Sequence, residues 1–205
     1  MDPGIFYLVN YSLALCLPVL VTIWSRRKKE SYGPELSFVF WIGVLLGAGW
    51  EFPFNAWAAY DPDSIVAYLV QPPLPWPVCA LLHSFWDGGI FLIGWGLVGL
   101  LSGSKRGDGF ISGFTAGNGY RPFQLWILVV WGQLQELLVE LGSLGIGAWE
   151  WRSAWWNPAL FEFQGHSITL LPQLIWLMAS LVFYAIMQAR GSGKGPAPRH
   201  SWNPF

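Results

Sequence analysis

Charged residues are scarce in this sequence. Only 11% of the 205 residues are charged, less than half of the roughly 25% usual for soluble domains, whereas 54% are hydrophobic. The net charge of −1, with no basic face, argues against nucleic acid as a partner. The two cysteines, Cys16 and Cys79, form no CxxC motif, so they indicate neither a redox site nor a zinc site.

The apolar residues are gathered into five long runs, and these runs predict the fold. They cover about residues 5–24, 36–58, 77–101, 122–143 and 167–189. Each has around 20 residues or more, enough for a helix to cross a hydrocarbon core of about 30 Å. They lack the alternating polarity of barrel strands. We therefore expect an all-α protein: a five-helix transmembrane domain over residues 1–189, followed by a disordered cytoplasmic tail over residues 190–205.

The positions of the basic residues predict the orientation in the membrane. No basic residue precedes the first run, so we expect a first span and not a cleaved signal peptide. Ten of the eleven Lys and Arg residues follow runs one, three and five, and only Arg152 lies on the other side. This bias predicts that the N-terminus lies outside and the C-terminus in the cytoplasm. The expected membrane is the endoplasmic reticulum or a bacterial inner membrane.

The loops predicted for the two sides differ in kind. Residues 102–121 are rich in Gly and Ser, and no strand precedes these glycines, so we expect a linker and not a nucleotide site. The outer loops are rich in aromatic residues and proline instead. Four tryptophans of the second outer loop suit either an interfacial belt or a lid over a pocket: Trp149, Trp151, Trp155 and Trp156.

Runs two, three, four and five carry ionisable or amide side chains in their interior. Each ionisable group there costs roughly 2.5–3.5 kcal/mol on insertion scales, which favours a functional role. Residues three or four apart share one face of a helix, so Glu51 lies with Asn55 and His83 lies with Asp87. At 1.5 Å per residue, one level roughly 9–10 Å below the outer ends contains a residue from each of these runs. These residues are Glu51, His83, Glu136 and Gln173.

This convergence predicts a shared polar pocket in the outer half of the bundle. The predicted catalytic residues are Glu51, His83, Asp87 and Glu136, and the predicted substrate-binding residues are Trp50, Asn55, Trp86, Gln133, Gln173 and Trp176. The alternative is that polar groups simply tie helices together, which is the better interpretation for a lone Gln or Asn. For Glu140, near the expected membrane surface, we expect solvation at the rim.

Three functions fit such a pocket. A carboxylic acid buried in apolar surroundings favours its protonated form and could protonate a lipid double bond without a cofactor. Aromatic faces would then stabilise the carbocation, by about 0.5–2 kcal/mol each. A zinc or iron site built from the same groups and His166 is the second option, although the HxxxH and HxxHH clusters of membrane oxygenases are absent. A non-catalytic lipid-binding subunit is the third, and a homo-oligomer is compatible with each.

Three short stretches resemble emopamil-binding-protein-type sterol isomerases. The stretch "CALLHSFWDGG" is similar to their Cys-x3-His-x3-Glu-Gly pattern, matched by Cys79, His83, Asp87 and Gly88 with Asp for Glu. The stretch "WGQLQELL" resembles their Gly-Gln span through Gly132 and Gln133, and "QLIW" resembles their Asn-x-x-Trp pair through Gln173 and Trp176, with Gln for Asn. The His/Asp pair lies here in the third span, not the second, and the family's Glu-x-x-Thr motif has no clear match.

The resemblance implies five spans and a sterol double bond moved by protonation and deprotonation. His83 and Asp87 would be the acid–base pair, and Trp176 would stabilise the cation. A further stretch, "GAGWEFPFNAW", looks like the Trp-Glu element of integral-membrane terpene cyclases of meroterpenoid pathways. Those enzymes use buried acids and no metal, which would make Glu51 an acid. The expected substrate is therefore a sterol- or terpene-like lipid.

Overall fold

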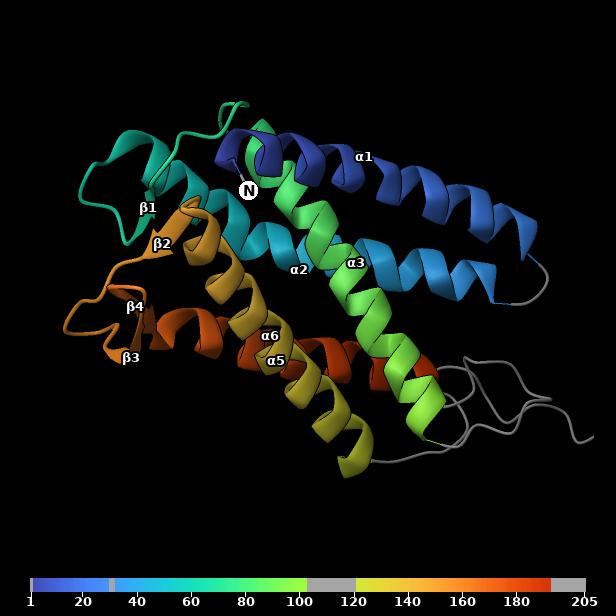
Figure 1. Ribbon diagram of the computed structural model, residues 1–205. Helices are drawn as coiled ribbons and strands as arrows, with labels where there is room; N and C mark the ends of the chain where they lie inside the picture. The colour runs from blue at the N-terminus through green and yellow to red at the C-terminus, as the bar shows by residue number, and fades with distance from the viewer. Residues whose placement is uncertain (1, 30–31, 103–120, 193–205) are drawn as a thin grey trace, which may run out of the picture.

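Five long helices form the protein, in a computed structural model that describes residues 2–29, 32–102 and 121–192 (Figure 1). They are α1 (Pro3–Arg27), α2 (Gly33–Tyr60), α3 (Val78–Leu101), α5 (Pro122–Ile146) and α6 (Leu170–Ser192). Within the described residues, all five are long and apolar enough to cross a membrane. The predicted five-helix fold is confirmed, and the chain is an integral membrane protein by this criterion.

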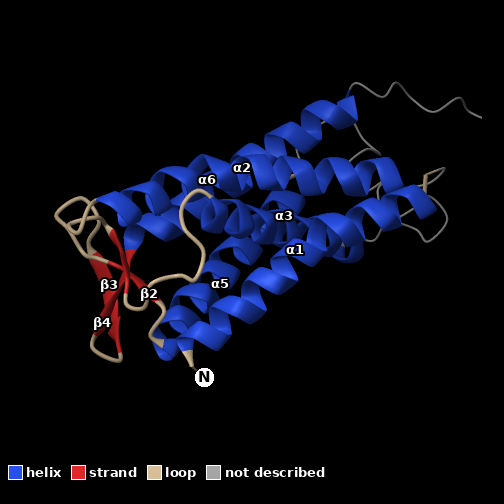
Figure 2. Ribbon diagram, turned by 90° about the horizontal axis from the view of Figure 1, so that it is seen from above, coloured by secondary structure: helices blue, strands red, loops and turns tan. Residues whose placement is uncertain are grey.

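Four short strands lie together at one end of the bundle, which we call the strand end (Figures 1 and 2). They are β1 (Val66–Tyr68), β2 (Trp149–Trp151), β3 (Ala159–Phe163) and β4 (His166–Thr169). β1 pairs antiparallel with β2, and β3 pairs antiparallel with β4. The loop after α2 is thereby joined to the loop after α5, a connection that the apolar runs did not predict.

The last span differs from its predicted limits at both ends. Residues 167–169 belong to β4, and α6 begins only at Leu170 because the β3–β4 hairpin carries the chain back to the bundle. At the other end α6 continues to Ser192, so the start of the predicted disordered tail is helical. There Arg190 pairs with Glu35 of α2, with 2.8 Å between Nε and Oε2. The remainder of the predicted tail lies outside the described residues, as do residues 103–120 of the linker predicted over 102–121.

Local signals in the sequence define several helix ends. Asp2 caps α1 by accepting a hydrogen bond from the backbone N–H of Ile5 (3.1 Å), and Pro3 occupies the first turn. Pro122 similarly begins α5. Gly147 ends α5 with φ of 74°, a left-handed conformation that glycine adopts without steric cost.

Helices α2 and α3 pack antiparallel in a register that repeats every four residues, and we call the paired positions the α2–α3 ladder. Its four levels are Gly43 with Phe91, Gly47 with Asp87, Glu51 with His83, and Asn55 with Cys79. The two glycine levels permit close approach. A Cβ atom placed on Gly47 would lie only 2.2 Å from Oδ2 of Asp87, and one on Gly43 would lie 2.9 Å from Cβ of Phe91. The two polar levels lie toward the strand end.

An aromatic core fills the middle of the bundle. Phe91 contacts both Trp176 and Phe183 of α6, with ring centroids 5.4 and 4.7 Å apart. Phe183 is completely buried, and the cluster continues toward the other end of the bundle through Val98 and Met187. The polar levels of the ladder therefore lie between this core and the strands.

Adding a methyl group at Gly47 tests the close approach in the ladder. We expect Gly47→Ala to lower the free energy of unfolding by about 1–3 kcal/mol, because the new Cβ overlaps Asp87. Gly49→Ala is the matched control, since a Cβ there meets nothing within 4 Å, and we expect it to be neutral or stabilising by about 0.5–1 kcal/mol. Thermal unfolding in detergent measures both. Equal stability of the two variants would contradict the proposed packing.

Candidate functional site

A pocket of about 360 Å³ lies between the ladder, the strands and the aromatic core. This volume is within the roughly 300–1,000 Å³ typical of small-molecule sites. All four predicted catalytic residues line it, as do four of the six predicted substrate-binding residues, Trp50, Asn55, Trp86 and Trp176. Most of the other lining side chains are apolar or aromatic, contributed by every helix and by β1 and β2.

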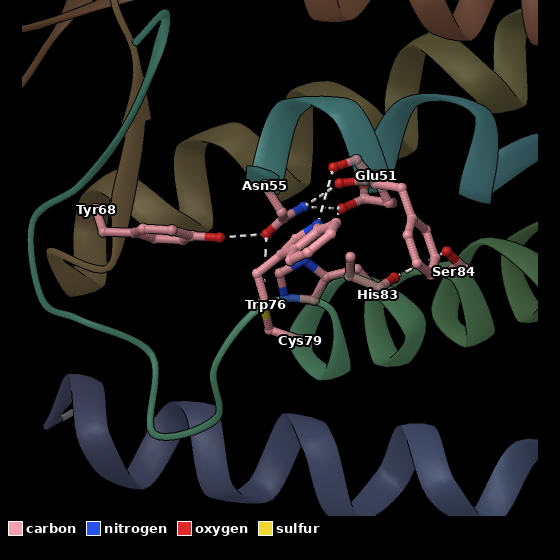
Figure 3. Close-up of polar contacts among 9 residues, drawn as sticks. Glu51, Asn55, Tyr68, Trp76, Cys79, His83 and Ser84 are labelled. Atoms are coloured by element: carbon pink, nitrogen blue, oxygen red, sulfur yellow. Dashed lines mark hydrogen bonds and ion pairs between the residues drawn. The ribbon is translucent and has the colours of Figure 1, made fainter. Parts of the chain in front are cut away.

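The third ladder level joins a carboxylate to an imidazole (Figure 3). Oε2 of Glu51 lies 3.1 Å from Nδ1 of His83, and it also accepts a hydrogen bond from Nδ2 of Asn55 at 2.8 Å. Because this oxygen acts as an acceptor, we assign the ring hydrogen to Nδ1. The Nε2 atom of His83 has no hydrogen-bond partner within the described part of the chain. When the His83 ring is neutral, Nε2 is therefore free to accept a proton in the pocket wall.

Tyr68 of β1 extends this chain of hydrogen bonds. Its hydroxyl donates to Oδ1 of Asn55, which also accepts a weak hydrogen bond from Sγ of Cys79 at 3.8 Å (Figure 3). Burial raises the pKa of Tyr68, so the hydroxyl keeps its hydrogen and remains a donor. The order from the strand end inward is therefore Tyr68, Asn55, Glu51 and His83, and each member orients the next.

Asp87 lies one helical turn from His83 and is the more enclosed of the two. It is 5% exposed, and its Oδ2 is packed against Gly47 without a hydrogen-bond partner among the described residues. An unpaired buried carboxylate is costly, whereas a neutral carboxylic acid is much less so. The surroundings therefore suit Asp87 as an acid that carries its proton.

Glu136 brings a third carboxyl group to the pocket from α5. It is 6% exposed and lies beside the side chain of Trp176. Its neighbour Gln135 also lines the pocket; its Nε2 donates to the carbonyl of Gly132, and its Oε1 is buried without a partner among the described residues. The wall formed by α5 thus carries polar groups that face the ladder across the cavity.

Aromatic rings surround these groups. The His83 ring is close to both Tyr11 of α1 and Trp149 of β2, with ring centroids 5.6 and 6.1 Å apart. On the α6 side, Trp50 contacts Trp176 edge to face at 5.4 Å. Such π faces stabilise a cation held near them, and the effect is larger where water is excluded.

Two predicted substrate-binding residues lie outside this pocket. Nε2 of Gln133 donates to the backbone carbonyl of Gln173 at 2.9 Å, which ties α5 to α6. Gln173 in turn donates to Oε2 of Glu140 at 3.3 Å. Glu140 also accepts from the N–H of Thr169 at 3.3 Å and is only 1% exposed. The expectation that Glu140 is solvated at the rim was therefore wrong, because β4 covers it.

The four tryptophans of the second outer loop lie in two different environments. Trp149 and Trp151 of β2 line the pocket, whereas Trp155 is 93% exposed and Trp156 is 41% exposed. His166 pairs with Glu150 instead of the pocket groups, with 2.6 Å between Nδ1 and Oε2. In residues 2–29, 32–102 and 121–192, no three His, Cys, Asp or Glu side chains are grouped so that they could hold a metal ion.

Several lining residues carried no signal in the sequence. Val66 and Tyr68 reach the pocket because β1 pairs with β2, and Asn10 and Phe6 reach it because α1 packs on α3. Gln135 is adjacent in sequence to Glu136, so a prediction that counted a wider face of this helix would have included it. The loop residues could have been found only by predicting the strand pairing.

Comparison with protein-family models, curated proteins and solved structures finds no match for this chain. The resemblance of its short stretches to sterol isomerases and terpene cyclases stays a prediction.

Removing the Tyr68 hydroxyl tests the hydrogen-bonded chain. We expect Tyr68→Phe to cost about 1–3 kcal/mol of stability, because Oδ1 of buried Asn55 loses its strong donor. Tyr60→Phe is the control, since Tyr60 is 74% exposed at the end of α2. Thermal unfolding in detergent compares the two variants. A Tyr68→Phe protein as stable as Tyr60→Phe would show that this hydrogen bond does not support Asn55.

Proposed function

We propose that the protein is a cofactor-free acid–base enzyme that isomerises or cyclises a sterol- or terpene-like lipid through a carbocation. One observation carries the proposal. A single pocket walled by aromatic rings holds an enclosed carboxyl group, Asp87, one helical turn from an imidazole that a second carboxylate orients. Acid, base and cation-stabilising surfaces are the three parts that such a reaction needs.

Asp87 is the proposed acid. Its proton adds to one carbon of a substrate double bond, which leaves the positive charge on the neighbouring carbon and a carboxylate on Asp87. The faces of Trp50, Trp86 and Trp176 stabilise this cation. Glu136, beside Trp176, adds negative electrostatic potential on the opposite wall when it is ionised.

His83 is the proposed base. Its Nε2 removes a proton from a carbon next to the cation, and the electron pair of that C–H bond forms the new double bond. If an internal double bond of the substrate attacks the cation first, the same proton removal completes a ring closure. Proton transfer from the imidazolium to the Asp87 carboxylate, directly or through water, restores the starting state. Glu51 acts in this scheme as the residue that orients His83, not as the acid that the terpene-cyclase resemblance implied.

The proposal includes an orientation in the membrane. The distribution of the basic residues supports an orientation with the strand end outside the cytoplasm, on the luminal or periplasmic side. The pocket then lies in the outer half of the bilayer, and the membranes we propose are the endoplasmic reticulum or a bacterial inner membrane.

Deuterium exchange tests the chemistry. Lipids extracted with the purified protein are identified by mass spectrometry, returned to it in vesicles made in heavy water, and analysed for deuterium on carbon. We expect the unmodified protein to introduce deuterium during double-bond migration or ring closure. Asp87→Asn and His83→Gln should each slow this by about 10²–10⁴-fold, the usual contribution of a general acid or base.

Glu162→Gln is the control, because Glu162 is an exposed carboxylate on β3 at the same end of the protein. It should exchange at the unmodified rate. Undiminished deuterium uptake by Asp87→Asn would remove Asp87 from the mechanism. Absence of uptake by the unmodified protein, with lipid bound, would support the non-catalytic lipid-binding alternative instead.

A further inference from the structure

The wall of the pocket formed by α5 runs from the inside of the bundle to its outer surface. Gln135 and Glu136 line the pocket and are buried, whereas Leu138 and Val139 also line it and are 58% and 41% exposed. Gly142, one turn further along, lines the pocket and is exposed. A cavity whose lining includes outward-facing side chains reaches the surface at that place.

The opposite side of this place is formed by α1. Phe6 and Asn10 line the pocket from there. Helix α1 packs against α2 and α3, and α5 packs against α3 and α6, so over their described lengths no extensive contact joins α1 to α5. Figure 1 shows the two helices diverging from the strand end, with α3 between them. We call the gap bounded by Phe6, Asn10, Leu138, Val139 and Gly142 the α1–α5 opening.

The opening is closed toward the strand end. The hydroxyl of Tyr7 donates to the carbonyl of Ala148 at 3.1 Å, which ties α1 to the residue that leads into β2. Both residues are fully buried, and Trp149 packs against Phe6 with ring centroids 6.0 Å apart. A molecule that uses this opening therefore passes between helices below the strands.

The surroundings of the opening are apolar. Leu13 on α1 and Leu134 on α5 are each 50% exposed, and Leu138, one turn after Leu134, is 58% exposed. Val139 lies about 10 Å from the end of α5 at 1.5 Å per residue, so it is within the hydrocarbon when the helix crosses the membrane. The medium outside the opening is therefore lipid.

We propose that the substrate enters and leaves sideways through the α1–α5 opening, from the hydrocarbon phase of the membrane. This deepens the proposed function and rests on it, because it restricts the substrate to molecules dissolved in the bilayer. An apolar chain or ring system passes between Phe6 and Leu138, and its reactive double bond comes to His83 and Asp87 on α3. Water-soluble diphosphates and glycosides are excluded as substrates by this route.

Two glycines of α5 provide a matched pair of variants. A Cβ added at Gly142 or at Gly145 meets nothing within 4 Å, so both positions accept a side chain without a clash. Gly142 lines the opening, whereas Gly145, about one turn further along, does not line the pocket. Gly142→Leu should obstruct the opening, and Gly145→Leu should leave it free.

The probes are a photoreactive, alkyne-tagged sterol and a photoreactive, alkyne-tagged farnesol, each preloaded with the protein into phosphatidylcholine vesicles. Excess untagged sterol or farnesol is then added, and aliquots are irradiated over time. Mass spectrometry locates the remaining label at pocket residues such as Trp149. We expect Gly142→Leu to slow displacement of the probe at least tenfold with unchanged labelling at equilibrium, and Gly145→Leu to behave like the unmodified protein.

Three other results would each overturn the proposal. Displacement from Gly142→Leu at the unmodified rate would show that the lipid passes elsewhere, and it would leave the proposed function intact. Weaker labelling of Gly142→Leu at equilibrium, with an unchanged rate of probe displacement, would show that Gly142 belongs to the binding wall and not to a passage. Labelling of the unmodified pocket by neither probe would contradict the opening and the proposed lipid substrate together.

Discussion

The close antiparallel contact of α2 with α3 is the constraint from which the site follows. At Gly47 the two backbones approach so nearly that Asp87 is pressed against a residue with no side chain. Antiparallel helices in this register bring the residues four positions further on α2 and four positions earlier on α3 together, which are Glu51 and His83. A bulkier residue in place of Gly47 would separate the helices and misalign this polar level.

The strand end contributes a hydrogen-bond donor to the polar levels of the α2–α3 ladder. Helices α2 and α3 give Oδ1 of Asn55 only the weak Sγ donor of Cys79, while the amide nitrogen of Asn55 bonds to Glu51. Tyr68 supplies the strong donor, and the pairing of β1 with β2 holds Tyr68 in place. The short strands outside the helices thus orient, through three hydrogen bonds, an imidazole inside the bundle. This makes the loops a structural part of the candidate site.

Composition and periodicity were sufficient for the helices and for part of the site. Long apolar runs identify spans because lipid requires every backbone group to be paired within the helix. The four-residue spacing correctly placed Glu51 with Asn55 and His83 with Asp87 on the pocket side. Spacing along one helix says nothing about the neighbour that a face meets, so Gln133 was assigned to the pocket although it bonds to α6. The burial of Glu140 depends on β4, which no apolar run predicts.

Nitrogen NMR of the histidine rings in bilayers tests the central pairing most directly. With ¹⁵N-labelled histidine, we predict that Glu51→Gln shifts the Nδ1 resonance of His83, because that nitrogen donates to the carboxylate across the ladder. Glu150→Gln should shift only the resonance of His166, its own partner. A His83 resonance that is unchanged in Glu51→Gln would contradict the α2–α3 register on which this description of the site depends.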